Sequence, residues 1–236
     1  MLKTCITGLF AALIIFHDSG PASAQSDSLQ ARQLGELTVH AFESDKEPLT
    51  TTATVGMLSP RSLGRFSNYT WANAVNTIPG VRMEERSPGS YRFSVRGSLI
   101  RSPFGVRNVK FYWNGIPFTD ASGNTPLNSV DYGAIQSMEV IKGPGSSLYG
   151  AGTGGVVLMQ SRPDNPYLNR AEQSVSLGKY GFQSRNSTLQ IGDISIQYGH
   201  SQQDGYRNHS AMARDAIRFS SSSSIGEKGT LSLLGM

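Results

Sequence analysis

The sequence predicts an exported chain in two parts: a small α+β domain, then antiparallel strands of the kind that begin a transmembrane β-barrel. Three observations support this fold class. An apolar N-terminal run ends at a small-residue cleavage site. Residues 55–162 mix a helical segment with strand-like runs around glycine turns. After Pro163 and Pro166 the pattern changes to short alternating strands, which is the sequence signature of a membrane barrel.

The N-terminus is typical of a secretory signal, which we assign to residues 1–24. Lys3 provides a positive start, residues 6–16 an apolar centre and Ala22-Ser23-Ala24 the cleavage site. The apolar run is about half of the ~20 residues that a membrane-spanning helix needs. Cys5, the one cysteine of the sequence, lies inside the signal. The mature chain is therefore expected to fold without disulfides.

A polar leader is expected over residues 25–54. Within it, the hexamer Glu36-Leu37-Thr38-Val39-His40-Ala41 is short, extended and β-prone. Such a segment can add as a strand to the sheet edge of a partner through main-chain hydrogen bonds. An ordinary short strand or a disordered tail is the simpler alternative when the hexamer is taken alone.

The globular region begins with one predicted helix and continues as strands. Residues 67–78 are expected to form the helix, with a Ser or Thr cap at its start and Pro79-Gly80 at its end. Residues 91–97 alternate as a half-buried strand does. Residues 109–118 predict two strands joined at Asn114-Gly115, because both positions tolerate a positive φ angle.

A glycine-dense segment closes this region. A strand ends at Lys142, a turn runs through residues 143–155, and a second strand covers Val156 to Met159. Residues 150–155 fit GxGxxG, but a dinucleotide site needs a helix directly afterwards. A strand and then Pro163 follow instead, so the sequence does not favour nucleotide binding.

Three segments together resemble the plug domain of TonB-dependent outer-membrane receptors. They are SVRG at 94–97, FYWNGIP at 111–117 and IQSMEVIKGPGSSLYGAGTGGVV at 135–157. The resemblance implies that residues 55–162 form a plug, a mixed α+β domain lodged inside a barrel of roughly 22 strands. It also implies that the chain is the N-terminal part of a longer receptor.

The resemblance assigns roles to two sets of residues. The hexamer 36–41 is similar to the TonB box, the segment that pairs with TonB and its inner-membrane energy-transducing complex. Arg96 and Lys142 are similar to basic plug residues that pair with acids of the barrel wall, a plug–barrel latch, with Glu139 as an internal partner. Two ordinary surface bases are the alternative for Arg96 and Lys142.

By the same resemblance, three loops face the cell exterior and contact ligand: residues 87–90, 100–107 and 119–127. Basic and aromatic side chains there suit an anionic, partly aromatic ligand such as a ferric siderophore. Solvated loop residues without a binding role are the alternative. The candidate contacts are Arg101, Phe104, Arg107, Asp120, Ser122 and Asn124.

Residues 163–170 are expected to be a linker, and residues 171–236 the first strands of an incomplete barrel. The roughly 70 residues after Pro166 supply about five strands at ~10 residues each. We expect strands over 172–181, 184–191, 194–201, 213–223 and 229–234, with a tight turn at 192–193 and a longer loop over 202–211.

Charge distribution and the absence of known motifs argue against a nucleic-acid-binding protein, a metalloprotein or an enzyme. Basic residues are scattered, which does not favour a nucleic-acid partner, and the net charge is only +4. His40, His200 and His209 are too far apart for a metal-ligand pattern, and no catalytic motif, cofactor or enzyme activity is expected. We expect an outer-membrane protein that contacts lipid and imports a scarce ligand. A secreted or surface plug-like binding protein without transport activity is the alternative.

Overall fold

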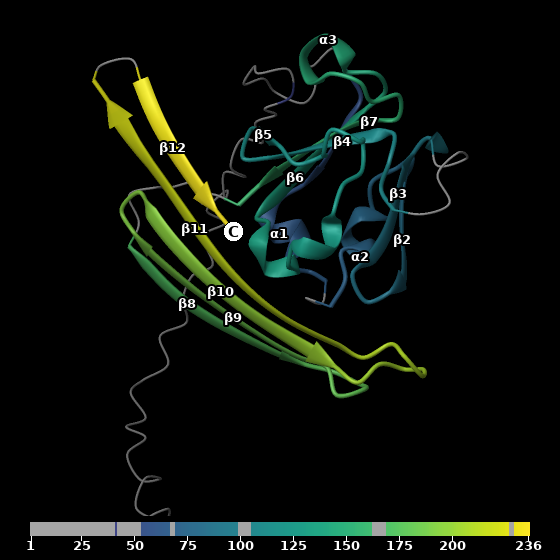
Figure 1. Ribbon diagram of the computed structural model, residues 1–236, viewed down its shortest axis with the longest axis vertical. Coiled ribbons are helices and arrows are strands. Elements are labelled where there is room, and N and C mark those ends of the chain that lie inside the picture. Colours follow the sequence, from purple (N-terminus) through teal and green to yellow (C-terminus); the bar gives the residue numbers. More distant parts are fainter. Residues whose placement is uncertain (1–40, 42–52, 67–68, 99–104, 162–168, 227–228) are drawn as a thin grey trace, which may run out of the picture. The chain divides into compact units, whose positions relative to one another are not determined.

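The computed structural model describes residues 41, 53–66, 69–98, 105–161, 169–226 and 229–236 (Figure 1). The signal segment, residues 36–40 of the hexamer, and Arg101 and Phe104 lie outside these ranges. Within them the chain forms two five-stranded sheets and a separate hairpin.

The first sheet has the strand order β1-β6-β7-β4-β5. β4 and β7 run parallel, and the other neighbours are antiparallel. The β4–β5 hairpin turns at Asn114 and Gly115, with φ angles of 48° and 81°, which confirms the predicted turn. The strands are β1 (Val55–Leu58), β4 (Val109–Trp113), β5 (Ile116–Pro117), β6 (Ser137–Lys142) and β7 (Gly155–Gln160).

A two-stranded hairpin and short helices complete this domain. The helices are α1 (Pro60–Leu63), α2 (Ala72–Val75), η3 (Leu127–Ser129), η4 (Tyr132–Ala134) and α3 (Ser146–Tyr149). The hairpin pairs β2 (Val81–Ser87) with β3 (Ser90–Val95).

The predicted helix over 67–78 is much shorter in the structure. Among the described residues 69–78, only α2, Ala72–Val75, is helical, and its N-cap residue Trp71 makes no side-chain cap hydrogen bond. Asn76 instead ties the end of the helix to β2: its Oδ1 accepts from the Met83 N–H at 2.7 Å and its Nδ2 donates to the Met83 carbonyl at 3.0 Å. This pairing ends the helix before Pro79.

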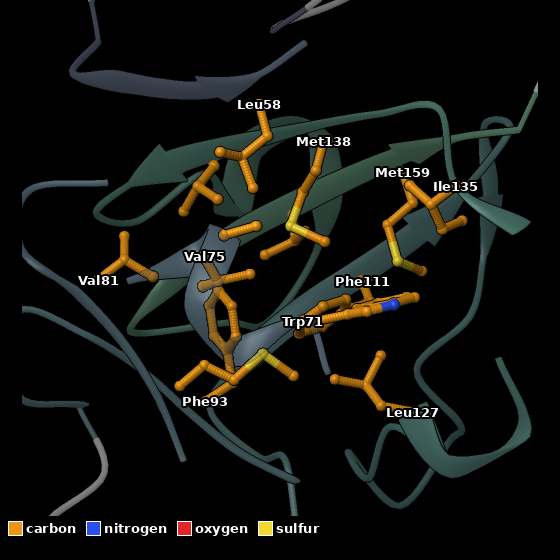
Figure 2. Close-up of a cluster of buried hydrophobic side chains, with 14 of the residues drawn as sticks. Leu58, Trp71, Val75, Val81, Phe93, Phe111, Leu127, Ile135, Met138 and Met159 are labelled. Atoms are coloured by element: carbon orange, nitrogen blue, oxygen red, sulfur yellow. The ribbon is translucent and has the colours of Figure 1, made fainter. Parts of the chain in front are cut away.

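The core of the domain lies between the hairpin, α2 and one face of the first sheet. Figure 2 shows Trp71, Phe93, Phe111, Met138 and Met159 converging from these elements. The rings of Phe93 and Phe111 meet edge to face with centroids 5.2 Å apart. Phe93, Phe111 and Met159 are fully buried, so the core fixes β3, β4 and β7 against one another.

The glycine-dense turn is compact because its glycines stand where side chains would collide. A Cβ on Gly154 would lie 2.6 Å from Ser98 Oγ and 2.9 Å from the Asn108 carbonyl oxygen. Gly155 has φ of +142°, and its Cβ would strike the carbonyl oxygen of Ile141. The turn also holds the short helix α3, which the sequence did not predict. A strand, β7, follows the glycines, as expected.

The second sheet is an antiparallel meander with the order β12-β11-β10-β9-β8, drawn as long curved strands in green and yellow in Figure 1. The predicted Gly192-Asp193 turn joins β9 to β10. The strand predicted over 172–181 ends at Leu177, because Tyr180 and Gly181 both have positive φ angles and reverse the chain. The strands are β8 (Arg170–Leu177), β9 (Gln183–Ile191), β10 (Ile194–Gln203), β11 (Met212–Ile225) and β12 (Gly229–Gly235).

The two faces of this sheet differ in polarity. Along β10, Ser195, Gln197, Ser201 and Gln203 are buried, and the first three outward positions of the strand are the exposed apolar residues Ile194, Ile196 and Tyr198. The large exposed apolar side chains of the sheet are Val175, Leu177, Leu189, Ile191, Ile194, Ile196, Tyr198, Ile217, Phe219, Ile225, Leu231 and Leu233. A polar inner face and an apolar outer face are the pattern of a membrane barrel.

Candidate functional site

Residues from all three loops that the sequence singled out border one cavity of about 470 Å³. The first loop is fixed by the Gly89 N–H, which donates to Glu85 Oε1 at 2.9 Å. The second and third loops are joined where the Thr125 N–H donates to the Val106 carbonyl at 3.0 Å. The lining residues are Pro88, Gly89, Ser90, Tyr91, Gly105, Val106, Asn124, Thr125, Pro126, Leu127 and Asn128.

The described wall of this cavity carries no charged side chain. Its polar groups are amides, hydroxyls and main-chain atoms, with Tyr91 as the aromatic. Burial, and then the charge of Glu85, raises the pKa of the Tyr91 phenol well above its ordinary value, so the hydroxyl stays protonated. The Tyr91 ring stacks on Trp71 at 6.4 Å between centroids, which anchors it to the core. The described part of the wall therefore offers hydrogen-bonding groups and one aromatic ring to a ligand.

The individual loop residues divide between the cavity and solvent. Asn124 lines the cavity, whereas Arg107, Asp120 and Ser122 are exposed outside its wall. Asp120 organises its loop instead: its Oδ1 accepts from Ser122 Oγ at 2.7 Å and from the Asn124 N–H at 2.8 Å. Asp120 therefore shapes the loop that carries Asn124.

A buried ion pair joins the first domain to the second sheet. Asp131 Oδ2 lies 3.9 Å from Arg218 Nη2, and both side chains are less than a tenth exposed. The same carboxylate oxygen accepts from the Gly133 N–H at 3.2 Å and so holds the start of η4. Gly199 allows this close approach, because a Cβ there would lie 3.2 Å from Asp131 Oδ2.

Two further arginines of the second sheet region bind main-chain carbonyls of the domain. Arg214 Nη1 donates to the Val130 carbonyl at 3.1 Å, and Arg207 Nη2 donates to the Arg86 carbonyl at 2.8 Å. Arg86 and Val130 flank the loops that border the cavity, so the β10–β11 loop and the start of β11 lie at the cavity end of the domain. In the ion pair, the domain supplies the carboxylate of Asp131 and the second sheet supplies Arg218.

The predicted latch residues are only partly brought together. Arg96 and Lys142 lie close, and burial followed by the charge of Arg96 lowers the pKa of Lys142. Neither makes an ion pair with another residue that the structure describes. Glu139 is buried three residues from Lys142 along β6, and strand alternation places it on the opposite face.

Ala41 is the one residue of the predicted TonB box within the described ranges. It is buried at 1% exposure and packs with Ile141, Tyr149, Val156 and Leu158. This cluster lies on the face of the first sheet away from the main core. Ala41 therefore contacts the sheet that contains the glycine-dense segment.

Four residues of these contacts were not predicted from the sequence: Asp131, Arg207, Arg214 and Arg218. An isolated Asp or Arg carries no local signal of its partner, which lies far away in the chain. The available clue was that Arg214 and Arg218 alternate with outward positions that include the apolar Ile217 and Phe219.

The described residues contain no group of three or more His, Cys, Asp or Glu side chains arranged to hold a metal ion. They also contain no helix long and apolar enough to cross a membrane.

Comparison with known proteins identifies the domain. Residues 47–157 match the family model of the TonB-dependent receptor plug domain. The vitamin B12 transporter BtuB of Vibrio vulnificus is 25% identical over 126 residues, which cover 53% of this chain and 20% of that protein.

Solved structures extend the likeness into the second sheet. The pyoverdine outer-membrane receptor FpvA of Pseudomonas aeruginosa superposes with a TM-score of 0.65 at 14% identity, covering 84% of this chain and 29% of that one. The siderophore receptor PiuA of Acinetobacter baumannii gives 0.58 at 21%, covering 80% and 26%. The chain spans less than a third of the length of each of these relatives. Residues 47–157 therefore form a TonB-dependent receptor plug domain, and the antiparallel strands after it have the fold with which the barrels of these receptors begin.

Proposed function

We propose that this chain is the plug and first-strand region of a receptor that imports a ferric siderophore across the outer membrane with energy supplied through TonB. The observation that carries the proposal is the contact of a plug with the polar face of a sheet whose other face is apolar. Lipid would cover that apolar face. The name of PiuA as a siderophore receptor supports the choice of ligand.

The plug would act in two ways. Its three loops offer a cavity in which a ligand is held from the exterior side. The TonB box, residues 36–41, would pair with TonB as an added strand, and tension on it would pass through Ala41 to the first sheet. The polar contacts of Asp131, Val130 and Arg86 with the strands would then have to break or slide for a path to open.

Arg96 and Lys142 would serve as a latch to an acid outside the described residues. Their proximity makes each a source of repulsion for the other, which an acid placed between them would relieve. The expected result of replacing both with Gln is faster loss of the plug from the barrel, measured by proteolysis of the plug in intact outer membranes. Unchanged proteolysis would assign both residues to the surface.

Uptake by whole cells tests the proposed function. Cells that carry the complete receptor gene are given ⁵⁵Fe loaded on a hydroxamate, a catecholate or a mixed-chelate siderophore, and internal radioactivity is followed. We expect uptake of one class that stops without TonB and after a protonophore, while binding at the cell surface persists. Surface binding without uptake under any condition would instead support the plug-like binding protein.

A further inference from the structure

We propose that a second cavity, of about 550 Å³ at the β8–β9 turn, binds an aromatic ring that carries an anionic oxygen. This cavity is separate from the three-loop cavity and shares no lining residue with it. Its lining residues are Tyr69, Ser176, Leu177, Gly178, Lys179, Tyr180, Phe182, Gln203 and Tyr206.

Four of the nine residues that line the cavity are aromatic. Tyr69 of the plug meets Phe182 edge to face, with centroids 5.1 Å apart. Tyr180 and Tyr206 stand 6.3 Å apart, with their rings tilted by 60°. Ring faces and edges that are not already stacked on a partner favour a flat aromatic guest.

The polar groups of the wall include an unpaired donor and a cation. Gln203 is 5% exposed, and its Nε2 is buried without a hydrogen-bond partner. A buried amide N–H left unpaired is costly, and an acceptor on a ligand would satisfy it. Lys179 adds a positive charge, and no acidic side chain lines the cavity in the described structure. A carboxylate or phenolate oxygen is the acceptor that fits both groups.

The backbone of Tyr180 supports a binding role. Its φ angle is +58°, a conformation that a bulky residue rarely adopts and that Asn or Gly would adopt at lower cost. The chain turns at this point in any case, because Gly181 also has a positive φ angle. Asn or Gly would relieve the backbone strain at Tyr180. A strained tyrosine in the cavity wall therefore indicates that its side chain has a binding role.

The inference deepens the proposed function, since it names the chemical class of a group that the ligand would carry. It can fail alone: a receptor that imports a siderophore without such a group would still depend on TonB. Binding to the cavity is therefore measured directly, apart from uptake.

The test uses the full chain purified in detergent and three probes, with saturation-transfer NMR and calorimetry. The probes are benzoate, its neutral analogue benzamide and its non-aromatic analogue cyclohexanecarboxylate. We expect benzoate to bind and each analogue to bind at least about fivefold more weakly. Equal binding of benzoate and cyclohexanecarboxylate, or no binding above that of empty micelles, would overturn the inference.

Two variants locate the binding. Gln203→Glu removes the donor and adds a repelling charge, and we expect it to weaken benzoate binding about tenfold or more. The matched control is Gln202→Glu, the same change one residue earlier in β10, where the side chain faces outward. Similar losses in both variants would contradict the assigned site.

Tyr180→Asn separates binding from folding. Because Asn tolerates the positive φ angle, we expect the variant to unfold at the same or a higher temperature than the parent. We expect it to bind benzoate more weakly because one ring of the wall is lost. Unchanged affinity for benzoate would show that Tyr180 is not part of a binding site.

Discussion

At the scale of single residues, Asp131 makes more of the described contacts that hold the plug to the strands than the charged residues selected from the sequence, Arg96 and Lys142. It is buried, pairs with Arg218 of β11 and accepts the N–H of Gly133 in η4, so one carboxylate joins two elements. By contrast, Arg170 and Glu172 form an exposed pair within one strand. Buried and exposed pairs differ in consequence, because removing one buried partner leaves an uncompensated charge.

Replacing Asp131 with Ala is expected to lower the free energy of unfolding of the chain in detergent by about 3 kcal/mol, since Arg218 stays buried without its partner. Unfolding in urea measures this change in the free energy of unfolding. The double variant Asp131→Ala/Arg218→Met should lose less than the sum of the two single variants. Glu172→Ala, the control in the exposed pair, should cost no more than about 1 kcal/mol. Equal costs at Asp131 and Glu172 would remove the case for a buried pair.

Asp120 provides a pH-dependent test of the loop that carries Asn124. The hydrogen bond from Ser122 and then the one from Asn124 lower the pKa of Asp120 below its ordinary value of 3.8. A lowered pKa means that the stabilisation is complete above that ordinary value and disappears as the pH falls through the lowered pKa.

Carbon-13 NMR of the Asp120 carboxyl group measures this titration. We expect Ser122→Ala to raise the pKa of Asp120 towards 3.8 and Ser129→Ala, which removes a hydroxyl that bonds the Pro126 carbonyl, to leave it unchanged. A titration of Asp120 that is the same in both variants would show that the Ser122 hydrogen bond does not form in solution.

At the scale of elements, turn residues predicted the element boundaries better than helix propensity did. Asn114-Gly115 and Gly192-Asp193 located two hairpins correctly, because few residues adopt positive φ angles. The helix over 67–78 was overestimated, since the Asn76 contacts to Met83 ended it early. β2 was not predicted. Its sequence VRMEERS is charged, and it is held as a strand by pairing with β3 and by burial of Met83.

The glycine-dense segment was recognised from sequence, but its physical reason required the structure. We expect Gly155→Ala to destabilise the chain by about 3 kcal/mol or more, because the positive φ angle is strained and the Cβ would strike the Ile141 carbonyl. Gly64→Ala, at φ of −65°, should change stability by less than about 1 kcal/mol. Thermal unfolding followed by circular dichroism compares them, and similar midpoints would contradict the packing described for Gly155.

At the scale of the whole molecule, the alternation of polar and apolar residues predicted β8–β12 and their two faces, because successive side chains of a strand point to opposite faces. The loops that border the first cavity were also identified in advance. The docking of the plug on the strands could not be predicted, because it depends on pairs such as Asp131 and Arg218, 87 positions apart in the chain.

Siderophore uptake by variants of residues 36–41 in the complete receptor shows whether the plug receives energy from TonB through this segment, as proposed. Val39→Pro removes a main-chain donor from residues 36–41, whereas Val39→Thr keeps it and remains β-prone. We predict that uptake is lost in Val39→Pro and retained in Val39→Thr, with equal ligand binding at the cell surface. Full uptake by Val39→Pro would contradict the account.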